Sequence, residues 1–471
     1  MRGGDLKFAP GEMVDEFLVW ERAHVGAQGV LYRVSGVDPS ARLLMKVPRI
    51  GGDDGAALVS YETEAMILPA LTGSHVPRFI AAGDLRRVPY VVFEQVEGRS
   101  LESFVADAPL PRDEVARIGA AVADAIHDLH LQEAVHCDLK PDNVILRPGG
   151  EAVLLDFGLA WHARFPDLLA EEKRHSFGST PYLSPEQLLG VRGDPRSDVF
   201  SLGVILYELA TGELPFGIPA TQREARQRLW DDPDPPRALH KLVTPELQEI
   251  ILHCLEPRLE KRYQSAAHVA LDLRNPAEVP LTDRAIRSRP SGFVGRTRRW
   301  WQAKVRPLEP PPQVFKPMER APVILVAVDT SHADDERHPM IRRATRQVLS
   351  LSQDFRLVCV SVIPAPALGA TGAESEGALH LEHTVRLRTW TESLGLPGRR
   401  LSLHVLVAAY PAAALVDFAK RNNVDLIVLG APRPGQEMLG WYRSVASGVT
   451  ANAHCSVHVV RVPQRRGEYH P

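Results

Sequence analysis

The sequence predicts two domains of different class, an α+β domain followed by an α/β domain built on a parallel sheet. Three observations predict this architecture. At 471 residues the chain is too long for a single hydrophobic core. Up to about residue 280, short strand-like segments give way to long amphipathic helices. From residue 322 onward, strand-like and helix-like segments alternate, which is typical of a parallel sheet.

The elements of each domain follow from periodicity. In the first domain, residues 112–130 place apolar side chains at helical spacing on one face. In the second, five apolar runs read as buried strands, and residues 367–378, rich in glycine and alanine, suggest a loop. The predicted helical face consists of Val115, Ile118, Val122, Ile126 and Leu129.

Residues 283–321, between the domains, form a predicted linker. Proline is frequent there, and ten Lys or Arg residues face three Asp or Glu residues. Trp300 and Trp301 lie among the basic residues, a combination that suits a membrane surface. Because the stretch is short and three prolines follow it, we favour a linker whose tryptophans pack on a neighbouring domain.

Composition limits the classes of function. The formal net charge of −3 gives no electrostatic footprint for nucleic acid. The four cysteines lie far apart without a C-x-x-C pair, which favours reduced thiols in a cytoplasmic chain over a disulfide framework or a zinc site. The first residues have no apolar signal segment, and no run approaches 18 apolar residues, so we expect a soluble protein without a membrane span.

Several residues of the first domain fit the needs of phosphoryl transfer, in which positioned cations and a base act on the reacting groups. Lys46, in the middle of the strand "LLMKV", could hold the α- and β-phosphates of a nucleotide. Glu64, on the following helix, could pair with that lysine and orient it.

The stretch "HCDLKPDN", residues 136–143, offers the remaining parts. Asp138 would accept the proton of a substrate hydroxyl, and Lys140 would neutralise the γ-phosphate. Asn143, and Asp156 in "LLDFGLA", would each ligate Mg²⁺.

With these motifs in order, residues 16–275 resemble a bacterial eukaryotic-type (Hanks-type) serine/threonine protein kinase. The resemblance implies a two-lobed kinase fold, ATP and Mg²⁺ as cofactors, and protein substrates with Ser or Thr acceptors. It also implies three structural residues: Asp198 would brace the backbone of the catalytic loop, and Arg262 would pair with Glu186 to tie the lower lobe together.

The same resemblance assigns the nucleotide pocket. In "AHVGAQGVLY" only Gly26 and Gly29 remain of the three glycines of the phosphate-covering loop, because His24 occupies the first position. We therefore expect weaker ATP binding with the chemistry retained, and the bulk of Leu44 should tighten the pocket. Phe93 would form the back of the pocket, and the backbone from Glu94 to Val96 would bind adenine.

Cys137 departs from the family pattern, which has arginine before the catalytic aspartate. That arginine receives a phosphate on the activation segment and orders it. A cysteine cannot do so, and the simplest interpretation is an active kinase that does not depend on that switch. Two interpretations of Cys137 stay open, a small buried thiol, which we favour, and a redox-sensitive one. Ser176 is the best candidate for autophosphorylation, whereas Ser179 aligns with a structural hydroxyl.

Residues 322–463 resemble a universal stress protein domain, an α/β fold with a doubly wound parallel sheet. Asp329 matches the acidic residue after its first strand. Gly430 and Ser444 match the ends of its glycine-rich phosphate loop, but Arg433 and Arg443 replace the two glycines between them. We expect weak ATP binding or none, and favour a structural, homodimer-forming or partner-binding domain, although the arginines could still attract an anion.

The predicted function is that of a cytoplasmic Ser/Thr kinase in stress signalling, with no nucleic-acid partner and no membrane binding. The alternative is a pseudokinase, an ATP-sensing scaffold whose output is the stress-protein domain. The intact set of reactive residues favours the enzyme, and His24 and Leu44 favour the scaffold.

Overall fold

The structure is a computed structural model that describes residues 8–26, 29–49, 56–84, 87–171, 181–219, 221–229, 232–288, 322–331, 337–350, 355–363, 373–396, 401–431 and 445–461. The described residues form two compact units. The first comprises those up to Arg274 and those from Leu281 to residue 288. The second comprises Asn275–Pro280, with the short helix η6 (Pro276–Glu278), and those from residue 322 onward.

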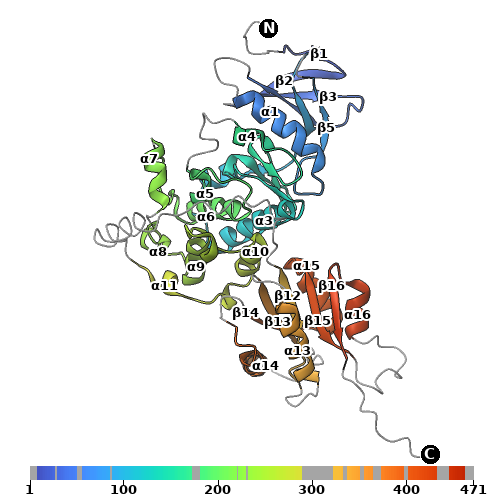
Figure 1. Cartoon of the computed structure of the whole chain (residues 1–471), viewed down its shortest axis with the longest axis vertical. Coiled ribbons are helices and arrows are strands. Elements are labelled where there is room, and N and C mark those ends of the chain that lie inside the picture. Colours follow the sequence, from blue (N-terminus) through green and yellow to red (C-terminus); the bar gives the residue numbers. More distant parts are fainter. Residues whose placement is uncertain are drawn as a thin grey trace, which may run out of the picture. The chain divides into compact units, whose positions relative to one another are not determined.

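The first unit begins with a six-stranded antiparallel sheet in the order β1-β2-β3-β4-β6-β5, and the helix α1 lies between β4 and β5 in sequence (Figure 1, blue). Alternate side chains of the sheet point into one apolar cluster that includes Phe17, Tyr32 and Met45. The elements of this lobe are β1 (Met13–Val14), β2 (Phe17–Val25), β3 (Gly29–Ser35), β4 (Leu43–Pro48), α1 (Ala56–Ile67), η1 (Leu68–Ala70), β5 (Phe79–Ala82) and β6 (Val91–Glu94).

A helical lobe follows. The predicted helix over 112–130 is α3 (Arg112–Leu131), and its five predicted face residues are all buried. It packs against α6 (Arg196–Thr211), which is buried almost all round and ends where Gly212 adopts φ 77°. The other helices of this lobe are α2 (Leu101–Ala106), α4 (Leu168–Glu171), α5 (Pro185–Leu188), α7 (Gln222–Ala225), α8 (Pro236–Leu239), α9 (Pro245–Cys254), α10 (Ala266–Arg274) and α11 (Asp283–Ile286).

Short strands and 3₁₀ turns lie in the segments that connect these helices. The strands pair antiparallel as β7-β9-β10 and β8-β11. They are β7 (Arg99–Ser100), β8 (Ala134–Val135), β9 (Val144–Leu146), β10 (Ala152–Leu154) and β11 (Trp161–His162), and the turns are η2 (Pro141–Asn143), η3 (Phe157–Leu159), η4 (Arg226–Leu229) and η5 (Leu259–Lys261).

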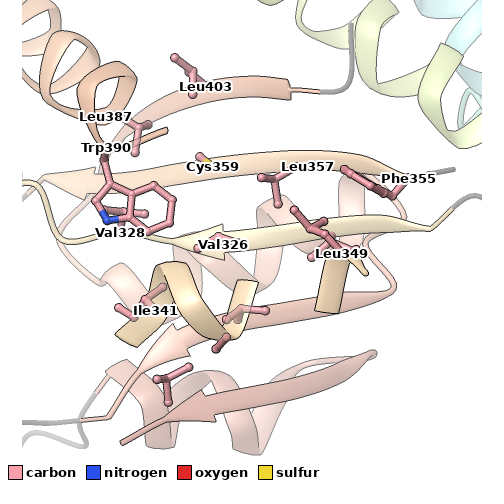
Figure 2. Close-up of a cluster of buried hydrophobic side chains, with 14 residues drawn as sticks. Val326, Val328, Ile341, Leu349, Phe355, Leu357, Cys359, Leu387, Trp390 and Leu403 are labelled. Carbon is pink, nitrogen blue, oxygen red and sulfur yellow. The ribbon is translucent and has the colours of Figure 1, made fainter. Parts of the chain in front are cut away.

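The second unit is a five-stranded parallel sheet in the order β14-β13-β12-β15-β16. Leu403 of β14 joins the cluster covered by α13 and α14 (Figure 2), whereas the ring of the next residue, His404, contacts the ring of Phe418 on α15 at an angle of 55°. Successive residues of a strand face opposite sides, so helices cover both faces of the sheet. The elements are β12 (Val323–Ala327), α13 (Arg337–Leu349), β13 (Arg356–Ile363), α14 (Ala373–Glu392), β14 (Leu401–Val407), α15 (Pro411–Arg421), β15 (Leu426–Gly430), α16 (Val445–Asn452) and β16 (Ser456–Val460).

The predicted fold classes are therefore confirmed, and two segments differ in detail. Residues 373–378, predicted as loop, form the first turns of α14, where alanine and glutamate favour a helix despite one glycine. Asp283–Ile286, placed in the predicted linker, form α11, which is capped by Thr282. Arg284 forms ion pairs with Glu249 of α9 and with Glu256, which follows that helix. The remainder of the linker, with Trp300 and Trp301, lies outside the described residues.

Candidate active site

Lys46 lies on the central strand β4 and contacts two carboxylates. Its Nζ is 2.6 Å from Glu64 Oε2 on α1 and 2.6 Å from Asp156 Oδ1. Burial opposes the lysine's charge, but the carboxylates of Asp156 and Glu64 outweigh it and raise the pKa of Lys46. The ion pair expected between Lys46 and Glu64 is thus present, and the ammonium stays charged at neutral pH.

Asp156 has a left-handed backbone, with φ 61° and ψ 80°. This conformation is costly for a residue other than glycine and is typical of functional turns. Burial opposes the charge of its carboxylate, but the Lys46 ammonium outweighs burial and holds the pKa of Asp156 below its usual range. The turn also requires a glycine at position 158, because a Cβ there would lie 2.0 Å from Ser60 Oγ on α1. The turn therefore fits closely under α1 and presents an ionised carboxylate.

Asp138 lies in a loop whose side chains contact one another. Asn143 Nδ2 donates to the Asp138 backbone oxygen at 2.8 Å and to Oδ2 at 3.3 Å. Lys140 Nζ is 3.5 Å from the same Oδ2. Since the Asn143 nitrogen is engaged with Asp138, its amide oxygen is the atom that would meet a metal ion.

Asp198 holds the backbone of this loop by hydrogen bonds. Its carboxylate accepts hydrogen bonds from the backbone N–H groups of His136, at 2.9 Å, and Cys137, at 3.0 Å. These two hydrogen bonds are the contacts expected of a residue that braces the loop backbone. A further hydrogen bond, from Leu155 N to Asn143 O at 2.8 Å, links the loop to the turn that carries Asp156.

The predicted nucleotide-binding residues lie along β2, β3 and β6. Gly26 N donates to Gly29 O at 2.9 Å, and a Cβ on Gly29 would lie 2.9 Å from Val47 O, so the chain must be bare there. His24 is exposed on β2 opposite Leu31. Residues 27 and 28 lie outside the described residues.

The remaining predicted nucleotide-binding residues lie at the end of β6 and in the segment that follows it. Leu44 pairs with Phe93 in the sheet register, and Phe93 and Val96 are buried. Glu94 is tied to the helical lobe by Arg147, at 3.1 Å from its carboxylate. Sequence reasoning missed Arg147, because an arginine directly after a short apolar strand carries no distinctive pattern.

Comparison with known proteins agrees with this arrangement. The model of the protein kinase domain family matches residues 25–272, more than half of the chain. The chain belongs to the protein kinase family. A second model, that of the universal stress protein family, matches residues 322–461, so the predicted resemblances of both domains are confirmed.

The curated relatives are bacterial kinases. Serine/threonine-protein kinase PknB of Mycobacterium leprae is 36% identical over 42% of this chain and 33% of its own length. A probable serine/threonine-protein kinase of Clostridium acetobutylicum is 27% identical over 55% of this chain and 40% of its own. The chain thus spans about a third to two fifths of these relatives' length. A crystal structure of the Mycobacterium tuberculosis PknI kinase domain matches with a TM-score of 0.46 and 22% identity, over 57% of this chain and all of that one.

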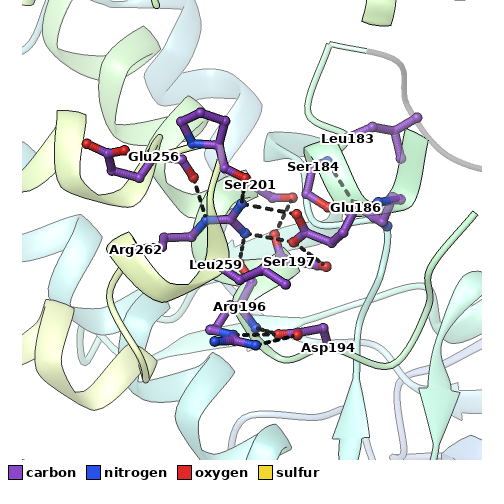
Figure 3. A network of polar contacts seen from close by, with 12 residues as sticks. Leu183, Ser184, Glu186, Asp194, Arg196, Ser197, Ser201, Glu256, Leu259 and Arg262 are labelled. Carbon is purple, nitrogen blue, oxygen red and sulfur yellow. Dashed lines mark hydrogen bonds and ion pairs between the residues drawn. The ribbon is translucent and has the colours of Figure 1, made fainter. Parts of the chain in front are cut away.

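The kinase domain has a buried ion pair between Arg262 and Glu186 (Figure 3). Arg262 donates to Glu186 through Nη1 at 2.7 Å and Nη2 at 3.0 Å, and both side chains are almost fully buried. Ser197 Oγ also donates to Glu186 Oε1, at 2.8 Å. The expected pair is therefore present, and the hydroxyl satisfies further acceptor capacity of the carboxylate.

Arg228 supports the substrate-side loop of the kinase domain and was also missed. Its Nη1 donates to the backbone oxygens of Pro181, at 3.1 Å, and Leu183, at 2.7 Å, while its side chain is 2% exposed. Burial lowers the pKa of Arg228 to about 10. No sequence pattern distinguishes such an arginine from a solvated one. Ser176 and Ser179 lie outside the described residues.

In the stress-protein domain, the carboxylate singled out by sequence already has a cation. Arg337 Nη2 lies 3.2 Å from Asp329 Oδ2. The same arginine lies over Gly430, where an added Cβ would meet its Cδ at 3.4 Å. Arg433, Arg443 and Ser444 lie outside the described residues, so the weak ATP binding expected of this domain stays a prediction.

Among the described residues, no helix is long and apolar enough to cross a membrane. Within the same residues, no group of three or more His, Cys, Asp or Glu side chains could hold a metal ion by itself. A Mg²⁺ site at Asn143 and Asp156 would thus need oxygen atoms from a bound nucleotide, as is usual for this ion.

Proposed function

We propose that the chain is a serine/threonine protein kinase that transfers the γ-phosphate of MgATP to protein hydroxyl groups. The observation that carries the proposal is the contact of Lys46 with both Glu64 and Asp156. In protein kinases the lysine–glutamate pair and the metal-binding aspartate must both be in place for transfer. One cation between two carboxylates also leaves a negative charge that Mg²⁺ would balance.

In the proposed mechanism, Lys46 binds the α- and β-phosphates, and Asp156 and Asn143 would hold Mg²⁺. When bound, the ion would supply positive charge that neutralises the phosphates. Asp138 positions the substrate hydroxyl and takes its proton, and Lys140, 3.5 Å from that carboxylate, stabilises the transferred group. Gly26 and Gly29 allow the backbone to approach the phosphates, and the backbone of Glu94 and Val96 binds adenine.

The test compares ATP-dependent labelling of a Ser/Thr acceptor by wild type and Asp138→Asn. The matched control is Asp113→Asn, because Asp113 lies at the start of α3 with a side chain 84% exposed. We expect the control to label like wild type and Asp138→Asn to lose activity. Binding of MgATP by wild type without transfer, under conditions where a known kinase labels the acceptor, would instead support the ATP-sensing scaffold.

The proposal has three further parts: a role in stress signalling, a cytoplasmic location and a homodimer formed through residues 322–463. The match of the second domain to universal stress proteins supports the role in stress signalling. Three of the four cysteines are free and buried, which supports a reducing location. We propose the domain limits 16–275 and 322–463 for truncated forms.

A further inference from the structure

Cys137 stands where the family has an arginine, and a different arginine lies beside it. The Cys137 side chain is 4% exposed, and its backbone oxygen accepts a hydrogen bond from Gln187 Nε2 at 2.7 Å. Burial raises the pKa of the Cys137 thiol to about 12, and the nearby Arg192 guanidinium acts in the opposite direction. The thiol is thus neutral at physiological pH and cannot balance the charge of Arg192.

Arg192 contacts the stretch from Asp156 to Asp167, the first described part of the activation segment, at three residues. Its Nε lies 2.9 Å from Asp167 Oδ2 and 3.1 Å from Oδ1. Its Nη2 donates to the backbone oxygens of Leu159, at 2.9 Å, and Ala160, at 3.3 Å. The side chains of Arg192 and Asp167 are 14% and 17% exposed, so water screens this ion pair far less than a surface pair.

The neighbouring residues fasten the same segment. Gly193 has φ +80°, and a Cβ there would lie 2.7 Å from the ring of Trp161, so the segment packs closely on this loop. On its other side, β11 pairs with β8, and Ala163 N donates to Glu133 O at 3.0 Å. The backbone from Asp156 to Asp167 is therefore held from both sides, and its attachment to Arg192 requires no phosphate.

We propose that Arg192 and Asp167 replace the phosphate switch of this kinase. Arg192 is the positioning cation in place of the arginine missing at position 137, and Asp167 supplies the negative charge that a phosphate would otherwise bring. The pair orders the segment that begins with the metal-binding Asp156 in the unphosphorylated chain. This inference rests on the proposed function.

The test uses the phosphatase-treated full chain and the variants Asp167→Asn, Asp167→Glu and Arg192→Met. We expect Asp167→Asn to lower kcat by about tenfold while the KM for ATP changes less than about twofold, since the contacts of Arg192 within the described residues are with Asp167, Leu159 and Ala160 and not with the residues proposed to bind ATP. Asp167→Glu should restore most of the rate. Adding Asp167→Asn to Arg192→Met should cost nothing further, because the two side chains act as one unit.

The matched control is Asp124→Asn, since Asp124 also pairs with an arginine, Arg274, but joins α3 to α10 away from the segment; this control pair is more exposed, with side chains 29% and 23% accessible. It should keep the wild-type kcat. Wild-type kcat in Asp167→Asn and Arg192→Met would overturn the inference, as would a tenfold loss of wild-type activity on phosphatase treatment.

A second measurement separates this inference from the proposed function. Hydrogen exchange of the Ala163 amide reports whether the segment is held, whether or not the chain transfers phosphate. We expect faster exchange in Asp167→Asn than in wild type and no change in Asp124→Asn. If wild type is inactive, the proposed function fails and the exchange result alone decides the inference; equal exchange in wild type and Asp167→Asn would refute it.

Discussion

The two domains arrange the carboxylate near a strand end in different ways. In the kinase domain, Lys46 lies between Glu64 and Asp156, so one negative charge remains for a metal ion to balance. In the stress-protein domain, Asp329 has its own partner, Arg337, which also lies over Gly430. The first arrangement has a surplus of negative charge that attracts cations, and the net charge of the second is already close to zero. This difference, more than the presence of a carboxylate, distinguishes a candidate phosphate site from a structural ion pair.

The largest expected effect is on catalysis in the kinase domain. Asp138→Asn and Asp156→Asn should each lower phosphoryl transfer by roughly three orders of magnitude, because one removes the proton acceptor and the other the anionic metal ligand. Steady-state kinetics with a peptide acceptor measures this. Equal rates in wild type and both variants would show that the charge surplus at Lys46 has no catalytic use.

The next effect concerns stability. Arg262→Met should lower the free energy of unfolding of the kinase domain by about 3–5 kcal/mol, because Glu186 would stay buried without its cation. Arg33→Met is the control: Arg33 pairs with Glu21 at the surface, both more than half exposed, and should cost about 0–1 kcal/mol. Urea titrations would detect the contrast, and similar losses in both variants would contradict it.

The sequence predicted the parts of the molecule that depend on local pattern. The α3 face and the five parallel strands follow regular apolar patterns in the sequence. The reactive residues of the kinase domain lie in short motifs, and the fold brings two of them, Asp138 and Asn143, into contact. Arg192, Arg228 and Arg337 were missed because their roles depend on partners at distant positions, such as the backbone of Pro181. An arginine looks the same in sequence whether it is solvated or buried. The start of α14 was missed because one glycine outweighed the helix-forming residues around it.

The third prediction concerns pH and the second domain. His404 is buried on β14, and burial, with a smaller contribution from Arg356, lowers its pKa to about 4. In the unfolded chain the pKa of histidine is about 6.5, so below that pH the unfolded state binds a proton that the folded state does not. The domain should therefore lose up to about 3 kcal/mol of stability between pH 6.5 and 4.

His404→Phe should reduce that loss, since phenylalanine fills similar space beside Phe418 and does not titrate. The measurement is the unfolding midpoint of the second domain against pH in the full chain. An identical pH dependence in wild type and His404→Phe would show that other groups control the acid sensitivity.

A smaller effect is expected for nucleotide binding by the second domain. Calorimetry of the full chain should give one ATP site, and Lys46→Met should remove most of its binding because the proposed function places the phosphates on Lys46. The variant Arg337→Ala leaves Asp329 uncompensated and should not create a site. A second site of micromolar affinity, about −8 kcal/mol, that persists in Lys46→Met would place nucleotide binding in the stress-protein domain and remove the contrast between the domains.

The smallest effect is expected at Ser176, the candidate autophosphorylation site. A phosphate there would lack the arginine that Cys137 replaces, and exposed pairs with nearby lysine or arginine contribute only about 0–1 kcal/mol. Because Arg192 is already engaged with Asp167, the added charge should shift the activation segment little. Ser176→Ala should therefore phosphorylate a peptide within a few-fold of the wild-type initial rate, and Asp138→Asn serves as the inactive reference. A loss of tenfold or more would mean that a phosphate at Ser176 finds a cation of its own and that the kinase depends on phosphorylation after all.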